Sequence, residues 1–274
     1  MTSIEINAFS GSGVSSVYIS DLVAWCNIEK THCNFSITSL YLNDVEVKDL
    51  VIPHEVTFVG FGAFAGCIGI TSVIIPNSVT SIGENAFFGC SSLTSVIIPN
   101  SVSTIDRSAF GQCTGLTSVN FFNGLTLIGH SAFYECSGLT SVSIPNSVSS
   151  IGADAFDFCN NLNSVVIGSG VTSIGAYAFA RCEKIANVFC YAKKVPKTDI
   201  KTFLDSYPEY TTLHVPASSV DKYKAADPWK NFKEIVALTE DDPKPDATGF
   251  NVVENAKDNK TVIYDLNGVR QSEL

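Results

Sequence analysis

The hydrophobic positions of the chain recur in a fixed pattern that returns at every 23rd position. Each repeat contains Ala-Phe, a cysteine three positions after the phenylalanine, then a leucine or isoleucine, a valine and a later isoleucine. No insertion or deletion separates the repeated cysteines, which are Cys67, Cys90, Cys113, Cys136, Cys159 and Cys182. An earlier repeat, from Val47 to Val59, fits the same frame with Asp44 in place of the cysteine. Self-similarity at a fixed period of this length indicates a repeat architecture.

Within one repeat, the pattern predicts two short extended segments joined by turns. Residues 93–98, LTSVII, alternate between apolar and polar positions and are rich in β-branched residues, which is typical of a strand. The following Pro-Asn-Ser predicts a turn, because proline fixes φ and cannot extend a hydrogen-bonded ladder. Residues 102–105 predict a second extended piece, and Ala-Phe-x-x-Cys predicts a helical turn that leads back to the next strand.

A single repeat is too small to bury its own apolar side chains. Stacked coils of identical length solve this problem, because each coil covers the apolar edges of its neighbours and pairs their strand hydrogen bonds. The sequence therefore predicts a repeat solenoid, α/β or mainly β, with a column of parallel strands.

The consensus SAFxxCxxLTSVxIPNSVTSIG resembles the repeat of the BspA-like leucine-rich repeat proteins of Bacteroides-type bacteria, over about residues 40 to 192. Residues 17–28, VYISDLVAWCNI, and residues 213–238 also resemble segments found in that family. The resemblance implies a right-handed leucine-rich-repeat-like stack, located outside the cell or on its surface and active in adhesion and protein binding. It implies no catalytic residues.

Departures from the repeat predict the remaining parts of the chain, because the ends of a solenoid need caps. Residues 1–40 carry Trp25, Cys26 and Phe35 in non-repeat sequence and are expected to form an N-terminal cap. The repeats themselves, residues 41–185, are expected to form the leucine-rich repeat solenoid.

After Cys182 the pattern decays, and residues 186–238 are expected to form a C-terminal cap. Within it, residues 198–207, 212–216 and 217–232 predict a helix, a strand and a helix. Residues 239–250 have the acidic, proline-containing composition of a linker. Residues 251–274 predict a strand and an Asn267-Gly268 turn, the start of a β module whose remainder would lie beyond Leu274.

Composition and charge narrow the possible partners. The chain is 45% hydrophobic and only 16% charged, which is not the composition of a disordered protein. Its net charge is −10, and no stripe of Lys and Arg is present to neutralise phosphates, so a nucleic acid partner is not expected. No apolar run approaches the ~18 residues of a membrane span. The N-terminus also lacks the features of a signal peptide, so the chain is either intracellular or numbered after processing.

Nine cysteines raise the question of disulfides or zinc. There is no CxxC pair, and stacked coils would place the repeat cysteines ~4.8 Å apart with parallel Cβ vectors, too far for a bridge. Buried free thiols that act as small apolar spacers are therefore expected. A metal clip made of Cys26, His32 and Cys33 is a weaker alternative.

The sequence predicts no enzyme and no catalytic, cofactor-binding or metal-binding residue. The four histidines, His32, His54, His130 and His214, lie in no recognisable nucleophile, base or zinc signature. Serine is abundant, but it recurs in the turns and strands of the repeat. The alternative is a catalytic triad whose residues are distant in the sequence and meet only in the folded chain.

The alternate positions of each strand are expected to face outward if the valine faces inward. One outward column is small and hydroxylic, and the other varies between apolar and polar residues. Such variation on a rigid repeat is what a binding surface could use, and drift on a solvent-facing strand is the alternative. The candidate interaction surface consists of Ser72, Ile74, Ser95, Ile97, Ser118, Asn120, Ser141, Ser143, Ser164, Val166, Phe189 and Phe122.

These observations favour a non-enzymatic surface or secreted interaction module that binds a host or bacterial surface protein. Two alternatives stay open, a glycan or small-ligand binding protein and a structural spacer that presents a C-terminal module. An aromatic cluster in a concavity would favour ligand binding, whereas contacts along the outward columns would favour protein binding.

Overall fold

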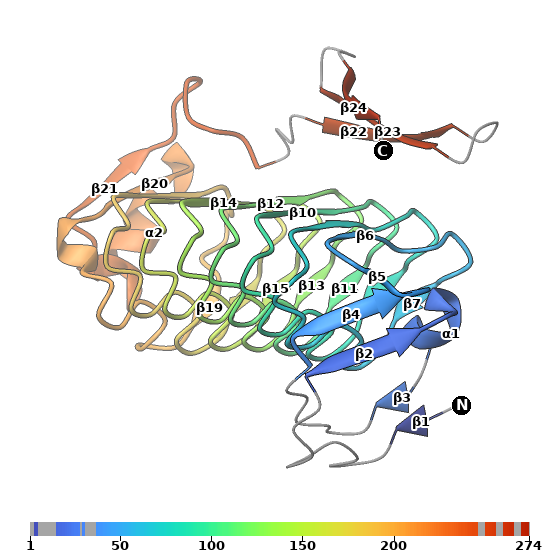
Figure 1. The fold of residues 1–274 in the computed structure, drawn as a ribbon. Coiled ribbons are helices and arrows are strands. Elements are labelled where there is room, and N and C mark those ends of the chain that lie inside the picture. The colour runs from blue at the N-terminus through green and yellow to red at the C-terminus, as the bar shows by residue number, and fades with distance from the viewer. Residues whose placement is uncertain are drawn as a thin grey trace.

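The computed structural model describes residues 15–27 and 37–245 in full. It also describes the backbone of five further strands, β1 (Ser3–Ile4), β3 (Glu29–Lys30), β22 (Phe250–Asn255), β23 (Lys260–Asp265) and β24 (Arg270–Glu273). Figure 1 shows the chain winding as a regular stack of coils from the blue N-terminal strands to the orange segment around β20 (Thr212–Val215) and β21 (Glu234–Ala237). The predicted repeat solenoid is confirmed, and it is mainly β.

One strand of each coil lies in a first column of parallel strands. Neighbouring strands pair at equivalent positions of successive repeats, as in Val73↔Val96 and Val142↔Val165. The column is divided into a four-stranded and a five-stranded sheet between β12 and β14, next to the repeat in which Phe121-Phe122 replaces Ile-Pro. Its members are β6 (Asp49–Val51), β8 (Ser72–Ile74), β10 (Ser95–Ile98), β12 (Ser118–Phe121), β14 (Ser141–Ile144), β16 (Ser164–Ile167), β18 (Asn187–Cys190), β20 (Thr212–Val215) and β21 (Glu234–Ala237).

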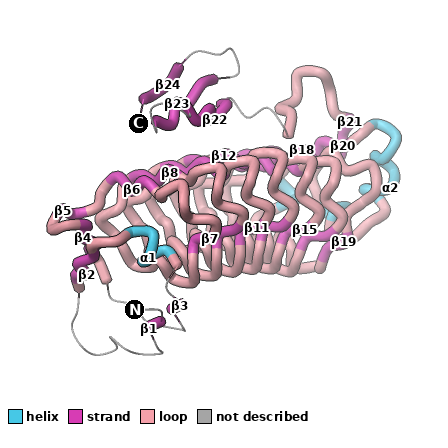
Figure 2. The backbone as a smooth tube through the Cα atoms, turned by 90° about the vertical axis from the view of Figure 1, so that its right-hand side faces the viewer, coloured by secondary structure: helices cyan, strands magenta, loops and turns pink. Residues whose placement is uncertain are grey.

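The second extended piece of each coil forms a continuous seven-stranded parallel sheet on another side of the stack (Figure 2). Threonine and serine precede these short strands, and their hydroxyls donate to the backbone of the preceding coil, as from Thr126 Oγ1 to Ser103 O at 2.9 Å. This ladder explains much of the recurring hydroxylic sequence. The strands are β7 (Phe58–Val59), β9 (Ser81–Ile82), β11 (Thr104–Ile105), β13 (Leu127–Ile128), β15 (Ser150–Ile151), β17 (Ser173–Ile174) and β19 (Lys197–Thr198).

The Ala-Phe-x-x-Cys segment is a series of tight turns rather than the expected helical turn. Its backbone N–H groups donate to the following coil, from Phe87 to Ala109 O at 2.7 Å and from Gly89 to Gly111 O at 2.8 Å. Left-handed backbone recurs at two positions of each turn, as at Ser108 (φ 52°). These left-handed residues prevent a helix. The N–H groups that bond to the following coil alternate with N–H groups, such as those of Phe88 and Cys90, that bond within the turn.

The core is a stack of phenylalanine rings that runs along the solenoid axis. Phe87, Phe110 and Phe133 are fully buried, with ring centroids 5.1 and 5.4 Å apart and interplanar angles of 4° and 5°. The stack continues through Phe156 and Phe179 with the same near-parallel geometry. Inward valines of the first strand column and the repeat cysteines complete the buried interior.

At the N-terminal end, β2 (Ser16–Ile19) pairs in parallel with β4 (Ser39–Leu42), which forms a hairpin with β5 (Val45–Glu46). Helix α1 (Leu22–Cys26) buries Trp25 and Cys26, and the Trp25 indole N–H donates to Ala63 O at 2.9 Å. These residues cover the first coil, as a cap would. Phe35 lies outside the described residues.

At the C-terminal end, β18, β20 and β21 continue the first strand column within the segment expected to be the cap. The helix expected at 198–207 is wrong, because these residues form turns in which Phe203 extends the phenylalanine stack, 5.8 Å from Phe179. The expected strand at 212–216 is β20. The last expected helix is broken into η2 (Ala217–Ser219), α2 (Val220–Lys224) and η3 (Trp229–Asn231), after η1 (Pro208–Tyr210).

The stack ends on Trp229, which is fully buried and meets Phe203 edge-on at 5.3 Å. Beyond the solenoid, β22, β23 and β24 form a three-stranded antiparallel sheet, so the predicted strand in this part of the chain is confirmed as β23. The Asn267-Gly268 turn lies outside the described residues. Among the residues that the structure describes, no helix combines the length and apolar character needed to cross a membrane.

Candidate interaction surface

The outward side of the first strand column, here called the strand face, carries both predicted columns. The hydroxylic column is exposed at Ser95, Ser118 and Ser141 and half-buried at Ser72 and Ser164. The hydroxyl of Ser72 donates to Asp49 Oδ1 in the preceding coil at 2.6 Å. This column therefore faces outward as expected.

The second outward column is open over the N-terminal half of the solenoid. Ile74, Ile97, Asn120 and Ser143 are half-buried there, and Phe122 is also half-buried beside them in sequence. The structure adds a residue that sequence reasoning missed, because Val51 pairs with Ile74 and is 53% exposed. The sequence could have identified Val51, because it lies one repeat before Ile74. Val51, Ile74 and Ile97 form an apolar run across three neighbouring strands.

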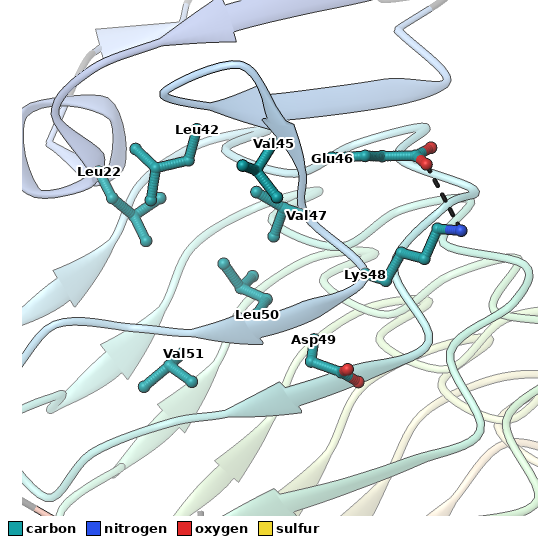
Figure 3. Close-up of a pocket in the computed structure, with 9 residues that line it drawn as sticks. All are labelled: Leu22, Leu42, Val45, Glu46, Val47, Lys48, Asp49, Leu50 and Val51. Carbon is teal, nitrogen blue, oxygen red and sulfur yellow. Dashed lines mark ion pairs between the residues drawn. The ribbon is translucent and has the colours of Figure 1, made fainter.

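A surface hollow of about 390 Å³ adjoins this run at the N-terminal end (Figure 3). Figure 3 shows Leu22, Leu42, Val47 and Leu50 around it, with the Glu46–Lys48 ion pair (3.6 Å) at one side. Val51 also lines the hollow, which makes the apolar run and the hollow one continuous area. The lining side chains are aliphatic or charged, and none is aromatic.

The C-terminal half of the second outward column is covered, which corrects the expectation for two candidate residues. Val166 is only 5% exposed and Phe189 only 8% exposed. They share a register with Ser143 and His214, in the order Ser143↔Val166↔Phe189↔His214. The cause lies in the chain that follows β21.

Residues 239–245, here called the strap, leave β21 and return to the strand face, as the orange loop of Figure 1 shows. Tyr191 OH donates to Pro243 O at 2.9 Å, and Ser143 Oγ donates to Pro245 O at 3.2 Å. Asp242 Oδ2 lies 3.6 Å from His214 Nδ1. Val166 and Phe189 lie between these anchor points in the register, so the strap spans them.

An aromatic cluster holds the strap. The His214 ring packs on Phe189 with a centroid distance of 4.4 Å, and Lys244 Nζ lies 5.9 Å from the Tyr191 ring centroid. Burial raises the pKa of the Tyr191 hydroxyl, and the carboxylate of Asp242 raises it further, so the hydroxyl stays a donor. Sequence reasoning missed Tyr191, His214 and Asp242, because their spacing along the chain matches no recognisable motif.

A serine, a histidine and an aspartate come together on the side of the stack formed by the Ala-Phe-x-x-Cys turns. His130 Nδ1 lies 2.6 Å from Ser131 Oγ, and His130 Nε2 lies 3.2 Å from Asp154 Oδ2. The backbone N–H groups beside the hydroxyl are committed to the solenoid, from Ser131 to Ala153 O at 2.8 Å and from Ala132 to Gly129 O at 3.3 Å. These two N–H groups are therefore not available as oxyanion-hole donors for this serine.

A second polar cluster on the turn side centres on the buried carboxylate of Asp157. Arg181 pairs with it through two nitrogens, with Nε at 2.9 Å from Oδ1, and its guanidinium lies 4.1 Å from the Phe158 ring centroid. Burial raises the pKa of Asp157 and the bonds from Arg181 oppose the rise. The pair joins neighbouring coils, which gives it a structural role.

The six repeat cysteines are buried thiols, as expected, and none of them forms a disulfide. From Cys90 onward they are also hydrogen-bond donors, which the expectation of plain apolar spacers did not include. Cys136 Sγ, for example, donates to Phe110 O at 3.0 Å. Among the described residues, no group of three His, Cys, Asp or Glu side chains is placed to hold a metal ion. For the metal clip, Cys26 is buried, whereas His32 and Cys33 lie outside the described residues.

The repeat matches the family model described as the BspA type leucine-rich repeat region, in six copies, over residues 36–152 and 126–222. The chain belongs to this family. No curated protein sequence matches it.

Solved structures of bacterial leucine-rich repeat proteins are similar to this member of the BspA-type family. A leucine-rich repeat protein of T. pallidum is 32% identical, with 56% of this chain and 73% of that chain covered and a TM-score of 0.54. One from Eubacterium ventriosum is 21% identical (73% and 62% covered, TM-score 0.58). The pneumococcal vaccine antigen PcpA is 15% identical (87% and 68% covered, TM-score 0.54), and these last two share the fold. Leucine-rich repeat solenoids are generally protein-interaction scaffolds and typically not enzymes.

Proposed function

We propose that this BspA-type protein is a non-enzymatic interaction module that binds a surface protein of a host or a bacterium through the open part of its strand face. The observation that carries the proposal is the apolar run of Val51, Ile74 and Ile97, which continues into the hollow beside β5 and β6. Apolar area of this kind on a rigid scaffold favours a protein partner. Asn120 extends the surface with a neutral polar group.

The test is capture by the immobilised full chain from extracts of host extracellular matrix and of bacterial surfaces. Three proteins are compared: wild type, the strand-face variant Ile74→Glu/Ile97→Glu, and the control Leu127→Glu. Leu127 is a suitable control because it is an apolar strand residue, 37% exposed, in the second strand column. Proteins retained by wild type and control but lost from the strand-face variant support the proposal. Equal retention by all three would contradict it.

Location outside the cell or on its surface belongs to the same proposal. This location is supported by membership in the BspA-type family, because the resemblance of the repeat to that family implies a role outside the cell. Brief protease treatment of intact expressing cells should remove the protein while a cytoplasmic marker survives. Protection of the protein equal to that of the marker would place it inside the cell.

Glycan binding is a second candidate function, favoured by one observation. Tyr18 of β2 and Tyr41 of β4 stack with centroids 4.5 Å apart, and Tyr18 is 63% exposed, so one ring face is open to a sugar. A glycan array probed with wild type and Tyr18→Ala tests it. Signals that vanish in the variant would support this function, and signals that persist would exclude this site.

A further inference from the structure

The strap and the surface beneath it meet as a peptide meets its binding site. The last bond of the strand ladder joins Leu238 N to Val215 O at 2.8 Å, and the strap then leaves the sheet. It returns with Pro245 buried against the strand face, four strands away from β21 at β14. A chain that only connected two parts would have no need of this contact.

Two of the contacts are made by the backbone of the strap. Tyr191 and Ser143 both donate to carbonyl oxygens of prolines, Pro243 and Pro245. Prolines favour an extended backbone and have no backbone N–H. A binding surface can therefore form backbone hydrogen bonds only with their carbonyl groups. Aromatic surfaces that donate hydrogen bonds to such carbonyls are a recurring way to bind extended proline-containing peptides.

One side-chain contact places a carboxylate of the strap beside a histidine of the strand face. Asp242 Oδ2 lies 3.6 Å from His214 Nδ1, on the ring that packs against Phe189. The same carboxylate oxygen accepts from Thr239 N at 2.7 Å, which fixes the bend where the strap leaves β21. The site thus combines an aromatic platform, two hydroxyl donors and a histidine.

We propose that the strand face from β14 to β20 is a binding site for an extended, acidic, proline-containing peptide, and that the strap occupies this site in cis. Displacement of the strap uncovers Val166 and Phe189 and lengthens the apolar part of the strand face. This site is separate from the open run at Val51, Ile74 and Ile97. The proposal for the strap is therefore tested independently of the function proposed for that run.

The first measurement uses the labelling rate of an introduced cysteine to report whether the strap covers its position. The described native cysteines are buried and give little background. Val166→Cys and Ile97→Cys place a thiol at equivalent positions, one under the strap and one on the open half. A strap variant, Asp242→Ala/Pro243→Gly/Lys244→Ala/Pro245→Gly, weakens the contacts without altering the strand face. With wild type as background, Val166→Cys should react with a thiol reagent at least about tenfold more slowly than Ile97→Cys. The strap variant should remove most of that difference and leave Ile97→Cys unchanged.

The second measurement tests binding in trans to the full chain. A fluorescent peptide of residues 239–249, TEDDPKPDATG, should bind the strap variant and show little binding to wild type, where a tethered strap competes at an effective concentration near millimolar. A peptide with both prolines replaced by glycine is the control. Adding Tyr191→Phe to the strap variant should weaken binding by about three- to tenfold, the effect of one hydrogen bond.

The labelling and peptide-binding results can each support or overturn the proposal. Trans binding that needs Tyr191 and the prolines, together with strap-dependent protection of position 166, supports the proposal. Absence of trans binding at millimolar peptide, equal binding to wild type and strap variant, or equal labelling of position 166 in both would overturn it. None of these results depends on the partner of the open run.

Discussion

At the scale of single residues, the thiol of each repeat cysteine from Cys90 onward donates to the carbonyl oxygen of a phenylalanine in the preceding coil. The Sγ–O distances are 3.1 Å for Cys90 and 3.2 Å for Cys113. At the end of the column Ser206 takes the same place, and its hydroxyl donates to Phe179 O at 2.5 Å. Cysteine suits the position because a single small side chain fills apolar space and satisfies a buried carbonyl.

This role predicts a difference between two small substitutions at Cys136. Cys136→Ala removes the hydrogen bond and leaves a small void, so it should lower the free energy of unfolding by about 1–2 kcal/mol. Cys136→Ser keeps a donor, as Ser206 does, and should cost less. Urea denaturation of both variants measures the difference. A serine variant no more stable than the alanine variant would show that the hydrogen bond has no net value.

The buried thiols also predict a loss of stability at alkaline pH. Burial raises the pKa of Cys113 to about 12, and it raises the pKa values of Cys90, Cys136, Cys159, Cys182 and Cys190 as well. The unfolded chain releases these protons at about pH 8.5, whereas the folded chain keeps them. Stability is therefore full below that pH and should fall above it, by about 1.4 kcal/mol per thiol and pH unit.

The measurement is the urea midpoint of unfolding between pH 8 and pH 10. Replacing one titrating thiol, as in Cys113→Ser, should reduce the alkaline loss by the share of one proton. A midpoint that does not move over this range would mean that the thiols are not protonated and buried as described.

At the scale of elements, the phenylalanine stack joins one coil to the next. Phe110 is fully buried between the rings of Phe87 and Phe133. Phe110→Ala should therefore leave a cavity and destabilise the protein by about 3–5 kcal/mol. Ser95→Ala, at an exposed position of the same solenoid, is the control. Equal unfolding midpoints for the two variants would be incompatible with the position of Phe110 in the stack.

Much of this architecture could be predicted from the sequence, because a fixed period specifies the contacts between neighbouring coils. The inward valines, the phenylalanine stack and the outward columns all follow from strands that pair at equivalent positions of successive repeats. The coil around Phe203 escaped prediction because it is one residue longer and carries Ser206 instead of cysteine. The covering of Val166 and Phe189 escaped prediction because the strap is held at Tyr191, Ser143 and His214 on either side of them, and these contacts break no repeat pattern.

At the scale of the whole molecule, the solenoid should tolerate the removal of one complete coil and of nothing smaller. Deletion of residues 91–113 removes one complete repeat and restores the register, so the shortened protein should fold with lower stability. Deletion of residues 91–101 removes about half a repeat, including strand β10, so the joined coil lacks a strand of the first column and cannot stack on its neighbours. Circular dichroism and thermal unfolding compare the two. Folding of the second protein to the same extent as the first would contradict stacking in register.

The open strand face is the surface proposed to bind a partner. The most direct test is the affinity of the captured protein for wild type, Ile74→Glu/Ile97→Glu and Leu127→Glu, measured in about 0.15 M and about 0.5 M salt. Because the open run is apolar and uncharged, wild-type affinity should change little at the higher salt, where the Debye length is about 4–5 Å. The strand-face variant should bind at least about tenfold more weakly and the Leu127→Glu control within about twofold of wild type. Equal affinities for all three proteins, or wild-type binding that collapses in salt, would contradict the claim.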